Sequence, residues 1–269
     1  MWSESICSYI MATTISDTNR ERDIAIDIVK FIAVLLILNS HAYVMYPKLQ
    51  ILATGGAIGD CLFLFCSGFT LFLGGQKPFG TYYKRRINRI YPSVFAAVVF
   101  TRIYIRDPQI VFWQLSGGEF VIAIMIYYII IYYIRKHFVN NIPFVLLVVA
   151  IVSILVYIFW FPYKYETSSQ GLYGITTYYR WIPYFAAMLL GAYTGIKRKE
   201  MKYNSIRDFT MLVLCVCIFY SIQFVSKLYR PVGSFHIVTI LPLMGIAIYL
   251  YKYIYVGICT RGICHNINN

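Results

Sequence analysis

Long apolar runs separated by short polar segments make up most of the chain. A helix that crosses the hydrocarbon core of a bilayer needs about 20 mostly apolar residues. Runs of about this length predict an all-α fold, a polytopic bundle of eight membrane helices, at residues 24–45, 53–74, 90–105, 120–134, 142–162, 181–196, 208–226 and 235–258. We expect one membrane domain over residues 23–258, with a cytoplasmic tail at 1–22 and a short tail at 259–269.

Composition agrees with this pattern. Hydrophobic residues make up 59% of the chain and charged residues only 13%, whereas a soluble domain has about 25% charged residues. The net charge of +13 does not indicate nucleic-acid binding, because no basic segment lies within a soluble module. The seven cysteines lack the paired spacing of a zinc site, so we expect no metal. The expected surroundings are a lipid bilayer.

The distribution of Lys and Arg predicts the orientation. Residues 75–89, 135–137 and 197–207 are rich in basic side chains, whereas the alternate loops contain few. Short loops rich in Lys and Arg stay in the cytoplasm. The amino terminus is therefore predicted to be cytoplasmic.

The first predicted helix, "DIAIDIVKFIAVLLILNSHAYVMYP" (23–47), carries a polar stripe. Asp27, Lys30 and His41 project within about 60° of one another on a helix. A charge within a membrane span costs at least about 2.5 kcal/mol unless it faces protein or water. We therefore expect the stripe to face the bundle interior. A structural alternative is an Asp27–Lys30 ion pair with an interhelical hydrogen bond from His41.

The stripe extends across most of the bilayer. Lys30 is expected in the cytoplasmic half and His41 near the outer half, because eleven residues of helix rise about 16 Å. Asp60, early in the next helix, is expected at a similar depth to His41, and Ser67 shares its helix face. The hypothesis is that Asp60 orients the imidazole of His41. Histidine suits proton transfer near neutral pH.

A basic segment, "FGTYYKRRINRIYP" (79–92), follows the second helix. Arg86 and Arg89 are three residues apart and would point the same way on a helix, close to Lys84. Paired guanidinium groups suit phosphate, since each donates two parallel hydrogen bonds. The alternative is a set of snorkelling cations that fix the topology and contact anionic lipid.

Three ordered stretches together resemble the family-3 membrane acyltransferases, which O-acylate cell-envelope sugars. The first is "RERDIAIDIVKFIAVLLILNSHA" (20–42), the second "AIGDCLFLFCSGFTLFL" (57–73), and the third "YYKRRINRIYP" (82–92). "YYRWIPYFAAMLLGAYTG" (178–195) is a weaker echo of a later family helix. Lys30 stands where the family usually has Arg, and eight predicted helices are fewer than the family's ten or so.

The resemblance implies an enzyme of the bacterial inner membrane that takes an acyl group, most simply acetyl, from cytoplasmic acyl-coenzyme A. Acyl-coenzyme A would be a co-substrate, and no permanently bound cofactor is expected. Its phosphates would contact Lys84, Arg86 and Arg89, and Lys30 would lie along the path of the thioester. His41 would be the general base on a saccharide hydroxyl. Candidate substrate contacts are Asp27, Ser67 and Arg180.

Two other functions fit the same features. A transporter of envelope saccharides would also carry charges on an internal stripe, and Pro183 and Pro242 could mark broken helices. A truncated and inactive relative would account for the apparent lack of the last family helices.

Overall fold

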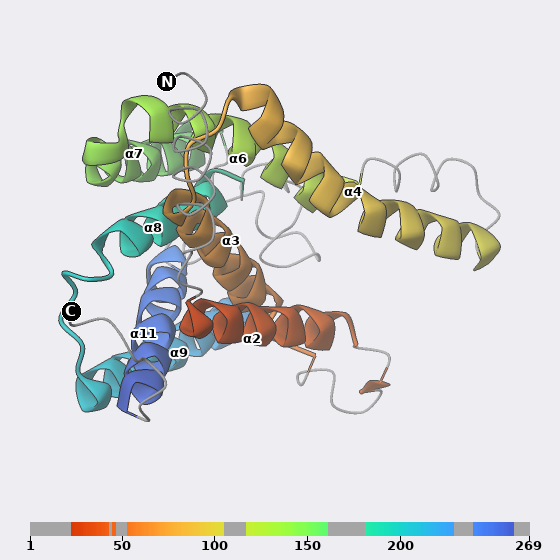
Figure 1. The fold of residues 1–269 in the computed structure, drawn as a ribbon. Coiled ribbons are helices and arrows are strands. Elements are labelled where there is room, and N and C mark those ends of the chain that lie inside the picture. The colour runs from red at the N-terminus through yellow and green to blue at the C-terminus, as the bar shows by residue number, and fades with distance from the viewer. Residues whose placement is uncertain are drawn as a thin grey trace, which may run out of the picture.

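The computed structural model describes residues 23–42, 45–46, 53–104, 117–160, 181–228 and 239–260. These residues form eight α-helices and one short 3₁₀-helix, with no strand among them (Figure 1). The elements are α2 (Ile24–His41), α3 (Gly56–Leu73), α4 (Phe79–Tyr104), α6 (Gly118–His137), η3 (Val139–Asn141), α7 (Ile142–Trp160), α8 (Trp181–Lys197), α9 (Ser205–Leu228) and α11 (Ile240–Thr260).

The eight helices correspond one to one with the eight predicted apolar runs. Six of the described spans are long and apolar enough to cross a membrane, those in α2, α3, α6, α7, α9 and α11. Helix α8 has only 17 residues, and the first turns of α4 are strongly basic. The prediction of an all-helical membrane protein is therefore confirmed, whereas eight crossings remain a prediction.

The third predicted helix differs most from the structure. Hydropathy predicted residues 90–105, but α4 starts at Phe79 and includes the whole basic segment. The polar residues there lower the mean hydropathy without preventing helix formation, because Lys and Arg are good helix formers. Arg86 and Arg89 consequently lie on one continuous helix, which also contains Pro92.

The two prolines that could have indicated broken helices do not break them. Pro183 and Pro242 lie in the first turns of α8 and α11, and both helices continue beyond them. Proline is tolerated in a first turn because its missing N–H would have had no helical partner there.

Helix α3 lies at the centre of the bundle, between α2 and α11 on one side and α6 and α8 on the other (Figure 1). Its closest approach is to α8. A Cβ atom on Gly68 would lie 1.8 Å from the Met188 carbonyl oxygen, and one on Gly191 would lie 1.9 Å from the Phe65 carbonyl oxygen. Small residues allow this backbone contact, as they do between membrane helices generally.

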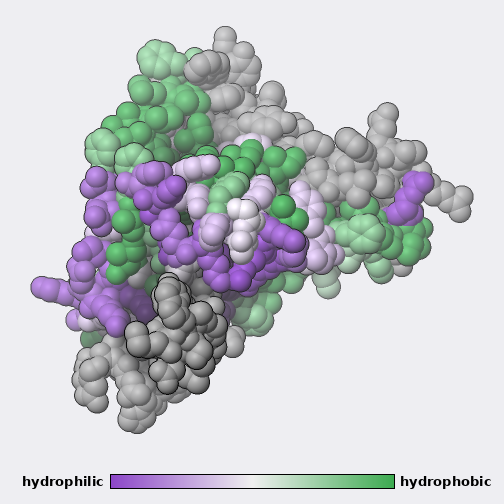
Figure 2. Space-filling model, turned by 45° about the horizontal axis from the view of Figure 1, so that its top comes forward, coloured by the Kyte–Doolittle hydropathy of each residue, from purple (hydrophilic) through white to green (hydrophobic). Residues whose placement is uncertain are grey.

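Apolar side chains are exposed on the outer helices, including Phe31 of α2, Phe95 of α4, Phe144 of α7 and Phe224 of α9. Figure 2 shows hydrophilic residues gathered across one face, with hydrophobic surface on both sides. Exposed apolar helix surface of this kind suits contact with lipid.

Candidate functional site

The polar stripe of α2 does not face the bundle interior as predicted, because Asp27 and Lys30 lie at the border of the packed face and His41 is exposed at the end of the helix. Its buried residues are Ala25, Ile26, Val29 and Ala33. The Lys30 Nζ atom lies 3.5 Å from Asp27 Oδ1, and both side chains are about one third exposed, at 32% and 33%. The ion pair predicted as the structural alternative is therefore present. An ion pair open on one side can still meet a ligand.

Helices α2 and α3 pack antiparallel along their lengths. The Cys66 thiol contacts the Ile26 carbonyl oxygen at 3.8 Å, and a Cβ on Gly59 would lie 2.8 Å from the Ala33 carbonyl oxygen. Ile26 directly precedes Asp27, so the start of the stripe lies beside α3. The stripe therefore meets α3 at Cys66.

His41 is the last residue of α2, and its side chain is exposed. Asp60 follows Gly59, whose nearest neighbours across the helix pair are Ala33 and Ile37. His41 lies one turn beyond Ile37, so Asp60 and His41 belong to the same end of the α2–α3 pair. The orienting role of Asp60 stays a prediction.

A polar link that sequence reasoning missed closes this end of the helix pair. The Asn39 Nδ2 group donates to the Thr54 carbonyl at 3.0 Å, and the Tyr46 hydroxyl donates to Asn39 Oδ1 at 3.0 Å. The presence of Asn39 in an apolar run, two residues before His41, is the signal that could have identified it.

The Ser-Gly-Phe sequence of α3 contacts three different helices. The Ser67 hydroxyl lies 3.1 Å from the Tyr128 hydroxyl of α6. Gly68 allows the close approach of α8. The Phe69 ring lies 5.0 Å from the Tyr251 ring of α11, and both side chains are fully buried. This motif therefore organises the bundle around α3.

Arg86 is packed between aromatic rings rather than extended into solvent. Its guanidinium carbon lies 5.3 Å from the centre of the Tyr82 ring and 5.5 Å from that of Tyr128. The Tyr82 hydroxyl donates to the Tyr128 carbonyl at 3.1 Å, which fixes the two rings relative to each other. The Arg86 Nε atom is buried and has no hydrogen-bond partner within the described part of the chain.

The other predicted phosphate contacts differ in setting. Lys84 and Arg89 are both exposed on α4, on either side of Arg86 in sequence. Arg180, the predicted acceptor contact, lies outside the described residues. Among these predicted phosphate contacts, Arg86 packs against aromatic rings, whereas Lys84 and Arg89 are exposed.

Arg135 serves a role that its sequence position did not reveal. The sequence predicts for it only a contribution to the topology, as one of the basic residues at 135–137. Its Nη1 group donates to the Leu71 carbonyl at 2.7 Å, its Nη2 group donates to the Gly74 carbonyl, and its guanidinium carbon lies 5.7 Å from the centre of the Phe72 ring. Carbonyls in the last turn of a helix have no helical partner. Arg135 therefore caps α3 from α6.

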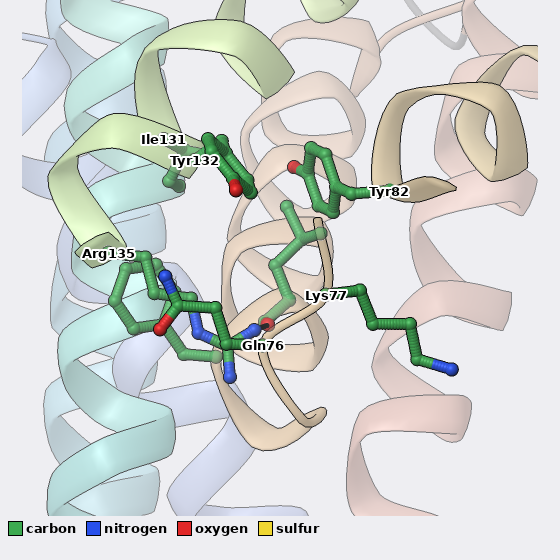
Figure 3. Close-up of a pocket in the computed structure, with 8 residues that line it drawn as sticks. Gln76, Lys77, Tyr82, Ile131, Tyr132 and Arg135 are labelled. Carbon is green, nitrogen blue, oxygen red and sulfur yellow. Dashed lines mark hydrogen bonds between the residues drawn. The ribbon is translucent and has the colours of Figure 1, made fainter. Parts of the chain in front are cut away.

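A small pocket lies beside this cap (Figure 3). The rings of Tyr82 and Tyr132 lie on one side of it and Arg135 and Gln76 on the other, while the Lys77 ammonium group points away. Its interior has room for about one water molecule. A nucleotide would not fit inside it.

Two consecutive residues of α3, Cys66 and Ser67, make the contacts to α2 and to α6. Cys66 contacts α2 beside Lys30 and Asp27, and Ser67 contacts Tyr128, on which Arg86 rests. Successive helix residues point about 100° apart. Helix α3 therefore contacts α2 through Cys66 and, on a neighbouring side, the tyrosine that supports Arg86 through Ser67. Sequence reasoning named Lys30 and Arg86 but not α3 as the element that joins them.

Comparison with known proteins identifies the family. The family model described as an acyltransferase domain, that of acyltransferase family 3, matches residues 23–255 and so includes α2 and all but the last turn of α11. No curated protein matches the chain, and no solved structure matches it either. The family match confirms the resemblance inferred from the motifs of α2, α3 and α4. The chain therefore belongs to acyltransferase family 3, and its spans make it a membrane member of that family.

Proposed function

We propose that this protein transfers an acyl group, most simply acetyl, from acyl-coenzyme A to a hydroxyl group of a cell-envelope saccharide. The donor would approach from the end of the bundle where α2, α4 and α9 begin and α3, α6 and α8 finish, here called the basic end. The acceptor would approach from the opposite end, where α2 finishes at His41. The observation that carries the proposal is the polar stripe of α2, which extends from one end to the other.

The donor side of the proposal depends on three cations of α4. The small pocket beside Arg135 is too small for a nucleotide, so the phosphates of coenzyme A would bind at the surface. Lys84 and Arg89 are exposed there and can contact them. The buried Nε–H of Arg86 has no protein acceptor among the described residues, and leaving such a group unpaired costs about 1–3 kcal/mol. An anionic group of the donor would satisfy it once the Tyr82 and Tyr128 rings move apart.

The pantetheine arm of the donor would then pass Lys30, which is partly exposed and paired with Asp27, so that the thioester reaches the His41 end of α2. The ammonium group there would donate hydrogen bonds to the amide oxygens of the arm. Lysine provides this charge without the fork of an arginine, so it would act as a point charge. Asp27 would hold the ammonium group in place.

On the acceptor side, His41 would remove the proton of the saccharide hydroxyl as it attacks the thioester carbon. The carbon–sulfur bond then breaks, and the leaving coenzyme A thiolate takes the proton from the His41 imidazolium. Asp60 would stabilise the imidazolium form, and Ser67 and Arg180 would contact substrate. Asp60 shares the acceptor end of the α2–α3 pair with His41, which supports this assignment.

A kinetic experiment tests the donor assignment. The purified protein in liposomes would receive acetyl-coenzyme A and a mixture of envelope oligosaccharides, and release of the free thiol would be followed. We expect Arg89→Glu to raise the donor KM tenfold or more and to change the acceptor KM less than twofold. Lys199→Glu is the matched control, because Lys199 is an exposed cation in the α8–α9 connection.

The outcomes separate the possible functions. Equal effects of Arg89→Glu and Lys199→Glu would contradict the donor site. Saccharide uptake into liposomes without any acyl donor, combined with no thiol release, would favour a transporter instead.

A further inference from the structure

Asp23 anchors the start of α2 through both of its carboxylate oxygens. Oδ1 accepts a hydrogen bond from the Ile26 amide at 3.2 Å, which is the usual bond of a helix N-cap. Oδ2 accepts a hydrogen bond from the Tyr251 hydroxyl at 3.0 Å. The first bond belongs to α2 itself, whereas the second ties α2 to α11, which is 228 residues away in the sequence.

Tyr251 is held tightly on all sides. Its side chain is fully buried, and its ring lies 5.0 Å from the Phe69 ring and 6.3 Å from the Phe65 ring, both on α3. Its hydroxyl group therefore has a fixed position relative to the central helix. A hydrogen bond from this hydroxyl transmits that position to Asp23.

A second set of contacts surrounds the same carboxylate. Arg198, just after α8, lies 3.9 Å from Asp23 Oδ2, and the Asp23 side chain is only 8% exposed. The Tyr203 hydroxyl donates to the Arg198 carbonyl at 2.5 Å. Burial raises the pKa of Tyr203 to about 12, so this hydroxyl is a donor across the whole physiological pH range. The start of α2 is thus tied to both α8 and α11.

We infer that Tyr251 is a positioning residue for acyl transfer, because its hydroxyl holds Asp23 and thereby sets the placement of α2. The residues of the polar stripe lie along that helix, with Lys30 about 10 Å and His41 about 27 Å from Asp23. A tilt of about 5° at the start of a rigid helix moves a group 27 Å away by about 2 Å. Displacements of about 1 Å can lower a rate a hundredfold.

The test compares Tyr251→Phe with Tyr253→Phe. Tyr251→Phe removes the hydroxyl group that donates to Asp23 and keeps the buried ring. Tyr253 is the control because it lies on the outside of the same helix and is 38% exposed. Hydrogen exchange of the amides in residues 24–30 is measured on the full chain in liposomes. Acetyl transfer from acetyl-coenzyme A is measured on the same samples.

We expect Tyr251→Phe to speed amide exchange in residues 24–30 at least fivefold and to lower kcat about tenfold, with less than a twofold change in the KM for acetyl-coenzyme A. This split follows because the α4 cations do not depend on Asp23. Asp23→Ala should show both changes at least as strongly as Tyr251→Phe, because it also loses the N-cap bond and the contact with Arg198, and the double variant should be no worse than Asp23→Ala. Asp23→Asn should keep most of both properties, since its Oδ1 can accept from the Ile26 amide and its Nδ2 can donate to the Tyr251 hydroxyl oxygen.

The results discriminate between the possible roles. Unchanged exchange in Tyr251→Phe would overturn the inference. Faster exchange with wild-type kcat would show that the contact is only structural and would equally overturn it. This inference rests on the proposed function for its kinetic part. If the wild-type protein transfers no acyl group, the proposed function fails, and the positioning role for acyl transfer is overturned with it, whereas faster exchange alone would still establish the Asp23–Tyr251 contact.

Discussion

The hydroxyl groups of Ser67 and Tyr128 share a hydrogen bond of 3.1 Å, and the same tyrosine ring supports the guanidinium group of Arg86. One side chain of α6 thus connects the central helix to the helix that carries the proposed donor-binding cations. This arrangement places a residue of the Ser-Gly-Phe sequence and a residue of the Arg-x-x-Arg sequence in one contact network.

Removing the Tyr128 hydroxyl should separate its two contacts. Tyr128→Phe loses the bond to Ser67 and keeps the ring beneath Arg86, so we expect a loss of about 1 kcal/mol in the free energy of unfolding and an unchanged donor KM. Tyr128→Leu also loses the ring, and the donor KM should then rise severalfold. Denaturation in mixed micelles and donor kinetics provide the measurements.

Tyr133→Phe is the control for that series, because Tyr133 lies on the same helix and is 50% exposed. A rise in donor KM in Tyr128→Phe as large as that in Tyr128→Leu would show that the ring contact with Arg86 is unimportant.

The contact between α3 and α8 should tolerate no side chain at its glycines. In Gly68→Ala the new Cβ would meet backbone, the Met188 carbonyl, at 1.8 Å, so the helices must separate. We expect a loss of 3 kcal/mol or more, seen as a failure to purify as a monodisperse protein or as a large fall in thermal stability.

Gly257→Ala is the matched control for this contact. Gly257 lies in α11 with no atom near its Cβ direction, so alanine should raise stability by up to about 1 kcal/mol. Equal stability of Gly68→Ala and the wild type would contradict the α3–α8 packing.

Arg135 should contribute through its shape as well as its charge. It donates from two nitrogens to two carbonyls at the end of α3, which one ammonium group cannot reproduce. We therefore expect Arg135→Lys to lose about 1–3 kcal/mol of unfolding free energy, nearly as much as Arg135→Gln. The exposed neighbour Lys136 offers the control, since Lys136→Gln should have little effect. Full stability of Arg135→Lys would show that charge alone suffices.

The positions of the helices could be predicted from hydropathy, because membrane crossings require long apolar runs. The start of α4 could not, since a basic helix in water or at an interface has no apolar period of its own. The ion pair of Asp27 with Lys30 could be predicted because it is local, at a spacing of three residues.

The partners of the site could not be predicted in the same way. Tyr128 and Tyr251 are two of 26 tyrosines, and nothing in the local sequence distinguishes them from the others. Their roles arise from contacts between helices that are far apart in the chain, which depend on tertiary packing. The sequence likewise shows the glycines of α3 and α8, but it does not show that these two helices pack against each other at those glycines.

The central claim is that the polar stripe of α2 ends in a general base, and His41→Ala tests it most directly. Thiol release from acetyl-coenzyme A in the presence of the oligosaccharide mixture would be measured for the wild type, for His41→Ala and for His137→Ala, which removes another exposed histidine at the end of α6. We predict a fall of at least a hundredfold in kcat for His41→Ala, because general-base catalysis contributes about 10²–10⁴-fold, with wild-type amounts of folded protein in the membrane. His137→Ala should keep wild-type activity. Wild-type rates in His41→Ala would contradict the account.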